Sequence, residues 1–175
     1  MEKHFFELLK NRRSIRKFLQ QPIEPEKIDL ILKAALMSPA SKRTNGWEFW
    51  VVQQKNTLEK MAECRPHGSK LLENAPLAIV VTADPNKSDV WFEDASIASI
   101  IIQLEAADLG LGSCWVQIYN REKDETISAE QYIKNILNIP AHLHVLNAIA
   151  IGYKDEERKP FDTEKLAYEK IHFHQ

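Results

Sequence analysis

Residues 88–109 constrain the fold more than any other segment, because they predict one long helix that is apolar on most of its surface. One face carries five apolar side chains at helical spacing: Ile97, Ile100, Ile101, Leu104 and Ala107. Ala98 and Ile102 widen this face. A helix that is apolar nearly all round is normally buried, so we expect this one to be covered on most sides. Gly110 favours a helix end directly afterwards.

Short apolar runs before and after this helix predict strands, because they are rich in β-branched and aromatic residues and are bounded by turn or polar segments. They span residues 49–52, 77–81, 113–119 and 145–151. Amphipathic helices are predicted near residues 5–9 and over 25–36. Asn56 and Ser128 carry signatures of helix starts, and Pro140 predicts the end of the helix that runs through Leu137. Helices and strands come in mixed order, so we expect an α/β fold.

No internal repeat, low-complexity tract or linker divides the sequence, so we expect residues 1–175 to form a single domain. After Gly152 the composition becomes strongly charged, and residues 154–175 predict an extended tail. Apolar side chains are spread through this tail: Phe161, Leu166, Tyr168, Ile171 and Phe173. They favour docking, with a partner subunit as the expected surface.

The charge balance argues against a nucleic-acid binder. The chain has 23 Lys+Arg and 25 Asp+Glu, which gives a net charge of -2 and no basic excess. No apolar run approaches the roughly 20 residues that span a bilayer. Cys64 and Cys114 are too few for a disulfide framework, and neither has a second cysteine at metal-ligand spacing. We therefore expect a cytoplasmic protein with reduced thiols and no membrane or nucleic-acid partner.

The segment NRRSIRKF, residues 11–18, concentrates Arg and Lys without a carboxylate. One interpretation is a solvated helix end, where basic residues favour the helix dipole. The other is a binding site, because Arg12, Ser14 and Arg16 alternate, and in an extended segment side chains two apart project to the same side. Two guanidinium groups and a hydroxyl would then converge, and arginine's planar donors match phosphate oxygens. A small phosphorylated ligand fits this pattern better than a polyanion.

Several other motifs are absent or incomplete. The sequence contains no G-x-x-x-x-G-K-[ST] P-loop. The glycines of residues 110–112 follow a helix and precede a strand, which is the opposite order to a Rossmann turn. His-x-His pairs at residues 142–144 and 172–174 lack a nearby third ligand, which disfavours a metal site. Cys114 lies in an apolar strand without a G-x-S-x-G elbow, so a hydrolase is a poor interpretation.

Four motifs, taken in order, resemble those of the FMN-dependent nitroreductase family. They are NRRSIRKF (11–18), SPASKRTNGWEF (38–49), GLGSCW (110–115) and AIAIGY (148–153). The match covers nearly the whole chain and includes the long apolar helix before GLGSCW. The resemblance implies an α/β sandwich in which helices enclose a mixed sheet. It also implies an obligate homodimer with two FMN molecules at the subunit interface and a C-terminal tail that wraps the partner subunit.

Carried over by position, the resemblance assigns cofactor-binding roles to these motifs. The first motif would hold the FMN phosphate and the polar edge of the ring. The second would reach the flavin from the other subunit, the third would run beside the isoalloxazine, and a late cation would join the phosphate site. The residues are Arg12, Arg13, Ser14 and Arg16; Pro39, Ala40, Ser41 and Arg43; Ser113, Cys114 and Trp115; and Arg158 or Lys159, with Lys165 and Lys170 as alternative tail cations.

The second motif departs from the family pattern. Arg43 stands where the family usually has Asn, and Asn45-Gly46 stand where it usually has Gln-Pro. If Arg43 faces the flavin ring, its charge would stabilise the anionic reduced state; if it faces solvent, it would not. Gly46 loosens a segment that proline would stiffen.

The implied activity is that of an FMN oxidoreductase. Flavin N5 would take a hydride from NADH or NADPH and pass two electrons to a nitroaromatic, quinone or related acceptor by a ping-pong mechanism. No protein residue is therefore assigned as catalytic, and no metal is expected. Two alternatives stay open: a flavin carrier or sensor without turnover, and a module that binds an anionic partner through residues 11–18.

Overall fold

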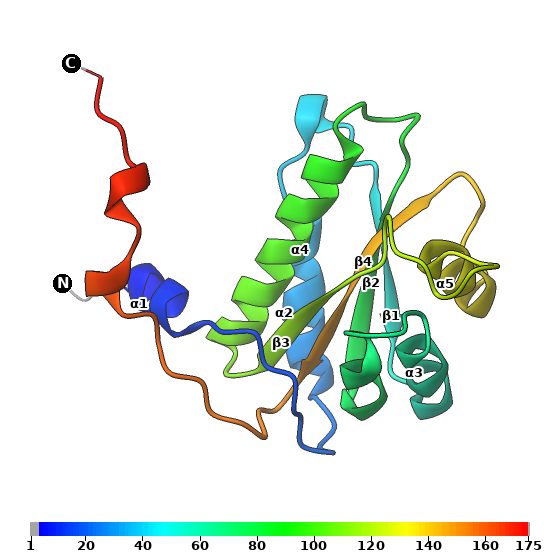
Figure 1. The fold of residues 1–175 in the computed structure, drawn as a ribbon, viewed down its shortest axis with the longest axis horizontal. Helices are drawn as coiled ribbons and strands as arrows, with labels where there is room; N and C mark the ends of the chain where they lie inside the picture. The colour runs from blue at the N-terminus through cyan, green and yellow to red at the C-terminus, as the bar shows by residue number, and fades with distance from the viewer. Residues whose placement is uncertain (1–3, 175) are drawn as a thin grey trace.

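The structure is a computed structural model that describes residues 4–174, and its centre is a four-stranded sheet (Figure 1). The strands are β1 (Trp47–Val52), β2 (Leu77–Ala83), β3 (Gly112–Gln117) and β4 (His144–Gly152). Their spatial order is β1-β2-β4-β3, and each neighbouring pair is antiparallel. A parallel contact is added at the outer edge of β3, where Ser14 and Ser113 form an isolated bridge.

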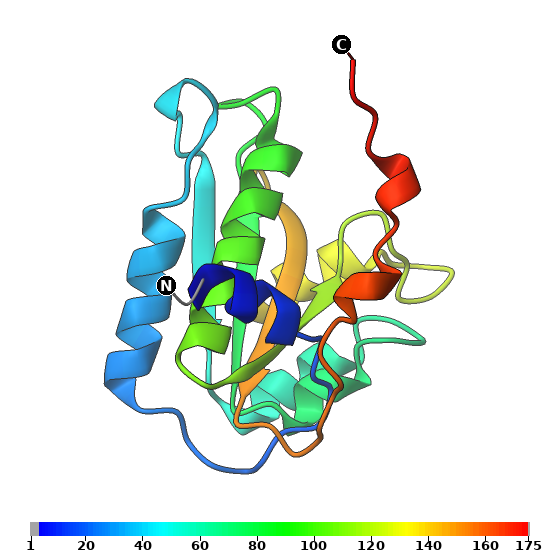
Figure 2. The same cartoon turned by 90° about the vertical axis from the view of Figure 1, so that its left-hand side faces the viewer.

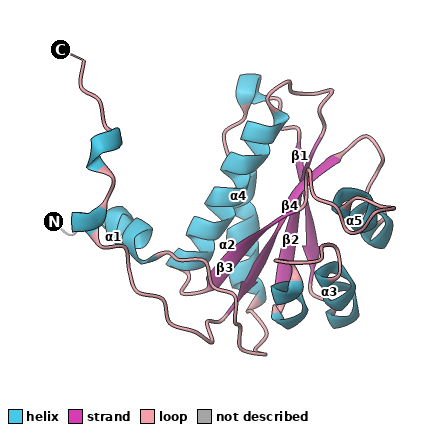
Figure 3. Cartoon of the chain, in the orientation of Figure 1, coloured by secondary structure: helices cyan, strands magenta, loops and turns pink. Residues whose placement is uncertain are grey.

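Helices enclose this sheet on both faces (Figure 3). Within the described residues, the α-helices are α1 (His4–Asn11), α2 (Pro25–Leu36), α3 (Lys55–Ala62), α4 (Trp91–Asp108) and α5 (Ala129–Leu137). α2 and α4 pack on one face, α3 and α5 pack on the other, and α1 lies against α4. The predicted α/β fold, with a sheet between layers of helices, is confirmed.

The central strand β2 explains why its sequence reads as an unbroken apolar run. Every residue of β2 is buried. Ala78 and Val80 belong to the core beneath α3 and α5, whereas Ile79 and Val81 belong to the core beneath α2 and α4. A strand covered on both faces has no polar side to alternate with the apolar one.

The predicted long helix is present as α4, but its orientation differs from the prediction. The side that meets the sheet carries mostly small residues: Ala95, Ala98, Ser99, Ile102 and Ala106. Ile97 and Ile100, which we expected to be buried, are 39% and 38% exposed. Small side chains allow the helix axis to lie close to the strands, and the larger aliphatic face is left outside. The prediction of burial on most sides is therefore wrong for a single chain.

Two predicted helix ends, at Gly110 and Ser128, are confirmed. Gly110 adopts φ +80° after α4, and the Leu111 N–H donates to the Ala106 carbonyl at 2.8 Å, as in a glycine-terminated helix. Ser128 caps α5, as predicted, by accepting from the Gln131 N–H at 3.1 Å.

One predicted boundary is wrong: α3 begins at Lys55, so Asn56 lies inside the helix instead of capping it. α5 ends at Leu137, as predicted, but the left-handed residue Asn138 ends it before Pro140 is reached. Within residues 4–174, no helix combines the length and the apolar character needed to cross a bilayer.

The C-terminal segment first runs beside the N-terminal segment and then leaves the body of the protein. Backbone hydrogen bonds join the two segments: Leu19 N–H to the Tyr153 carbonyl (2.9 Å), Asp155 N–H to the Lys17 carbonyl (3.0 Å) and Phe161 N–H to the Lys10 carbonyl (2.9 Å). Beyond Phe161 the tail extends past α1 and away from the sheet (Figures 1 and 2). Its apolar side chains are exposed, and Phe173 reaches 86%.

Candidate functional site

A cavity lined by charged residues of both signs lies where residues 11–18 pass between β3, the C-terminal end of α4 and the start of the tail. Its volume is about 590 Å³. The lining includes Arg12, Arg13, Ile15, Ala107, Leu111, Ser113, Glu156 and Arg158. The cavity thus combines an apolar floor from the helix and the sheet edge with charged groups from the two terminal segments.

Residues 11–18 are held in place by the edge of β3. Ser14 forms a bridge with Ser113, and the Ile15 N–H donates to the Ser113 carbonyl at 2.9 Å. Ile15 is buried against Gly112, where an added Cβ would lie only 2.8 Å from the Ile15 Cβ. Glycine is therefore needed at position 112 for this close approach.

The structure brings Arg12 and Arg13 to the cavity wall. Arg13 donates to the carbonyl of Lys159, and its guanidinium lies 4.5 Å from the centre of the Phe161 ring. The guanidinium groups of Arg12 and Arg16 make no ion pair or side-chain hydrogen bond within residues 4–174. Arg16 is exposed, and Ser14 is engaged at the strand edge. Arg13 and Arg12 thus line the cavity, instead of the alternating set Arg12, Ser14 and Arg16.

Glu156 connects the two terminal segments and was not predicted from the sequence. Its carboxylate accepts from the backbone N–H of Arg16 and, at 3.2 Å, from that of Lys17. The same carboxylate pairs with Arg158 at 2.7 Å. The donated hydrogen bond from Arg16, aided by the charge of Arg158, lowers the pKa of Glu156 from its ordinary value. The run of charges around Glu156 reads as solvated surface, which is why sequence reasoning missed this contact.

The predicted tail cations separate in the structure. Arg158 lines the cavity and is held by Glu156. Lys159 contributes its backbone carbonyl to Arg13, and its exposed side chain lies outside the lining. Lys165 and Lys170 lie in the exposed part of the tail, beyond Phe161.

The predicted residues of β3 have three different environments. Ser113 and Trp115 share one face of the strand but contact different groups along it, whereas Cys114 faces the other side. Ser113 lines the cavity. Trp115 packs against the core beneath α2 and α4, and its Nε1–H donates to Gln117 Oε1 at 2.8 Å. Cys114 is buried, and this burial raises the pKa of its thiol.

The second predicted group lies at the opposite end of α4. Pro39, Ala40, Ser41 and Arg43 belong to the loop of residues 38–46, which follows α2. The Ser41 N–H donates at 2.9 Å to Asp94 in the first turn of α4, whereas Ala107 near the last turn lines the cavity. Thirteen residues of helix separate Asp94 from Ala107, which corresponds to about 20 Å at 1.5 Å per residue. One chain therefore does not bring the two predicted groups together.

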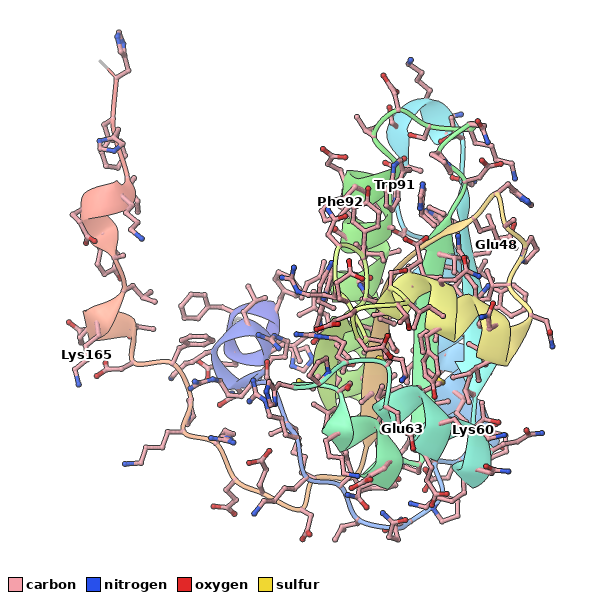
Figure 4. All side chains as sticks on the ribbon, turned by 45° about the vertical axis from the view of Figure 1, so that its right-hand side comes forward. Glu48, Lys60, Glu63, Trp91, Phe92 and Lys165 are labelled. Atoms are coloured by element: carbon pink, nitrogen blue, oxygen red, sulfur yellow. The ribbon has the colours of Figure 1, made fainter. Side chains whose placement is uncertain are left out.

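The N-terminal end of α4 also carries an aromatic cluster (Figure 4). Trp91 stacks on His144 with 5.0 Å between ring centres, and Tyr119 meets both rings edge-on. His144 Nδ1 lies 2.9 Å from Glu130 Oε1. No group of three His, Cys, Asp or Glu side chains in the described part of the chain could hold a metal ion.

The cavity at the edge of the sheet therefore presents one guanidinium group, that of Arg12, without an ion pair or side-chain hydrogen bond in the described part of the chain. Together with the apolar residues Ile15 and Leu111, it defines a class of protein whose sheet-edge cavity suits a small ligand with a phosphate and a flat ring system.

Comparison with known proteins identifies the family. The chain matches the model of the nitroreductase family over residues 9–65 and 63–153. A solved structure described as an FMN-dependent nitroreductase from Clostridium difficile R20291 is 50% identical, covers 97% of this chain and 99% of its own, and has a TM-score of 0.95. A protein from Archaeoglobus fulgidus, named provisionally as an NADH dehydrogenase/NAD(P)H nitroreductase, is 37% identical over 90% of this chain and 89% of its own length. The chain belongs to the nitroreductase family.

A more distant relative, named FMN reductase [NAD(P)H], comes from Bacillus subtilis strain 168. It is 26% identical over 83% of this chain and 64% of its own length.

Proposed function

We propose that the protein is an NAD(P)H-dependent FMN oxidoreductase whose cavity beside β3 binds the FMN phosphate. The observation that carries the proposal is the guanidinium group of Arg12, which makes no ion pair or side-chain hydrogen bond within residues 4–174 and lies at a cavity that Arg13 and Arg158 also line. Arg16 lies outside that lining, four residues further along the same segment. The names of the relatives support FMN as the cofactor and a nicotinamide nucleotide as the electron donor.

The residues of the cavity fit FMN in size and chemistry. A volume of about 590 Å³ lies within the range of roughly 300–1,000 Å³ that is usual for small-molecule sites. Arg12, Arg13 and Arg158 offer donors to a phosphate, while Ile15 and Leu111 offer an apolar surface to a ring. Three carboxylates also line the cavity, on Asp155, Glu156 and Glu157, against four cations, on Arg12, Arg13, Lys154 and Arg158. Glu156 opposes an anion less than its charge suggests, because its carboxylate already pairs with Arg158 and with two backbone N–H groups.

The protein residues would bind and orient, because bound FMN supplies the hydride chemistry at N5. Arg12 would hold the phosphate at the cavity wall, and Arg16 would approach it from outside the lining. The packing of Ile15 on Gly112 would fix the segment that carries both residues. NADH or NADPH, and then a nitroaromatic or quinone acceptor, would occupy the same open face in turn. This order gives ping-pong kinetics.

We also propose that two copies of the chain build each site. Loop 38–46 lies about 20 Å from the cavity of its own chain, so it would serve the cavity of the other. Large apolar side chains are exposed on neighbouring surfaces, including Phe5 on α1 and Ile97 and Ile100 on α4. A second subunit would bury this face, and the exposed tail would wrap that subunit. A single domain and a cytoplasmic location belong to the same proposal.

Flavin binding to arginine variants tests this proposal. Arg12→Ala and Arg16→Ala each remove hydrogen bonds to a charged group, which are worth roughly 1.5–3 kcal/mol, so the Kd for FMN should rise roughly 10- to 150-fold. Arg121→Ala is the matched control, because Arg121 is exposed and its side chain donates only to the neighbouring Asn120 carbonyl within residues 4–174. An unchanged Kd in both test variants would contradict the phosphate site.

Reduction of the bound flavin separates an oxidoreductase from a carrier or sensor. Under anaerobic conditions, NADH or NADPH should bleach the flavin absorbance within the time of a turnover. A protein that binds FMN tightly but is reduced slowly by both nucleotides would fit a carrier instead.

A further inference from the structure

We propose that Asp94 is a positioning residue, which holds loop 38–46 of one subunit in the shape that completes the flavin site of the other. The inference rests on the proposed function, because it assumes a flavin site shared between two chains. It concerns a residue that lies far from the cavity of its own chain.

Asp94 joins three segments of the chain through one buried carboxylate. The residue is 4% exposed. Its Oδ1 accepts from the Ser41 N–H at 2.9 Å, and its Oδ2 accepts from the Ser88 hydroxyl at 2.9 Å. Because Asp94 lies in the first turn of α4, the helix dipole also favours its negative charge. Loop 38–46 is thereby fastened to the helix whose other end lines the cavity.

The loop that Asp94 fastens has an unusual backbone. Lys42, Arg43 and Asn45 adopt φ of 50°, 58° and 45°, in the left-handed region that side chains other than glycine seldom enter. Such conformations persist where surrounding contacts hold them, and they concentrate at binding sites. Within the loop, the Arg43 N–H donates to the Ala40 carbonyl and the Thr44 N–H donates to the Ser41 carbonyl.

Those internal bonds fix the shape of the loop but not its direction relative to the helix. The hydrogen bond from the Ser41 N–H to Asp94 attaches one side of the loop to α4 and so sets its orientation. On the other side, the Asp84 N–H donates to the Gly46 carbonyl at 2.9 Å. The exposed residues between these two attachments, Lys42, Arg43 and Asn45, are therefore presented outward in a defined orientation.

Alanine and asparagine at position 94 distinguish positioning from general stability. Asp94→Ala removes both acceptors and should weaken FMN binding at least tenfold while the protein remains dimeric. Asp94→Asn keeps an acceptor for the Ser41 N–H and should recover most of the affinity. Glu93→Ala is the matched control, because Glu93 is an exposed carboxylate in the same helical turn, and its Kd should equal that of the wild type.

Mixed dimers test whether Asp94 acts on the other chain. When Arg12→Ala and Asp94→Ala subunits are mixed and exchanged, each heterodimer should contain one site with both defects and one intact site. Random pairing makes about half of the dimers heterodimers, so about one quarter of all sites should bind FMN with wild-type affinity. If Asp94→Ala does not fold, Ser41→Pro replaces it in the same mixture, because proline lacks the N–H that donates to Asp94.

The outcomes are distinguishable by FMN fluorescence titration. Recovery of tight sites in the mixture, together with rescue by Asp94→Asn, is the expected result. A mixture without recovered sites would place the effect of Asp94 within its own chain and overturn the inference. So would an Asp94→Ala protein with the wild-type Kd. A wild-type protein that binds no FMN would overturn the proposed function itself.

Discussion

Replacing Gly112 with alanine tests whether packing against β3 positions residues 11–18. The added Cβ would lie 2.8 Å from the Cβ and Cγ2 of Ile15 and 2.9 Å from its Cγ1. These separations are too short for carbon atoms, and Ile15 is only 3% exposed, so its side chain cannot swing into solvent. The segment that contains Ile15 must therefore move away from the strand, and Arg12 moves with it.

The size of the effect follows from this overlap. Overpacking a closely packed core costs roughly 1–3 kcal/mol. In a protein of this length, each kcal/mol lowers the Tm by about 2–4 °C, so Gly112→Ala should lower the Tm by about 2–12 °C. The Kd for FMN should also rise, because the hydrogen bond from Ile15 to the Ser113 carbonyl is strained as the segment shifts.

Thermal unfolding without FMN and fluorescence titration with FMN measure the two effects separately. Gly46→Ala is the comparison, because its added Cβ would lie 3.3 Å from the Cβ of Lys87, a tight contact that a small shift relieves; we expect a smaller loss of Tm than for Gly112→Ala. Ile15→Gly should relieve the overlap in the Gly112→Ala background, whereas Ile15→Ala should not, because the Ile15 Cβ is itself one of the overlapping atoms. A Gly112→Ala protein with wild-type Tm and Kd would refute the reasoning.

Three further predictions concern other parts of the molecule. Ser128→Ala removes the cap of α5 and should lower the free energy of unfolding in urea by about 1 kcal/mol; an unchanged midpoint would show that the cap contributes nothing. Because Glu156 has a lowered pKa in the folded protein, its stabilising contribution is present above the ordinary glutamate pKa and is lost as the pH falls through the lowered value. The Arg16 amide signal in NMR should therefore shift in acid, and a shift that survives in Glu156→Gln would contradict this assignment. Burial raises the pKa of Cys64 to about 11, so at pH 8 only about a thousandth of it is thiolate; rapid labelling by a disulfide reagent in the folded protein would disprove this.

The elements of the fold were predictable where one physical signal dominated. Continuous apolar runs located β2 and β4, because strands covered on both faces carry no polar side. The orientation of α4 was not predictable in the same way. Helical spacing shows which residues share a face, but it does not show which face meets the sheet, and here Ala95 and Ala98 meet it while Ile97 and Ile100 do not.

The arrangement of the candidate site depended more on tertiary structure. The cations of residues 11–18 were identifiable from the sequence, and Arg12 does lie at a cavity. Which arginine joins Arg12 at the cavity depends on how residues 11–18 lie along β3. The bridge between Ser14 and Ser113 sets that alignment, and these two residues are distant in sequence. The roles of Asp94 and Glu156 depend on hydrogen bonds to backbone N–H groups, and these leave no pattern in side-chain composition.

The pairing of residues 10–19 with 153–161 has a practical consequence for handling the protein. A purification tag attached next to α1 or to the exposed tail would lie on the surface that we expect the partner subunit to cover, and it would obstruct assembly. The turn around residues 120–126, between β3 and α5, is a safer insertion point, because Asp124 stabilises it through local bonds to the Thr126 N–H and hydroxyl and to the Ile127 N–H. Labels for fluorescence or immobilisation belong there.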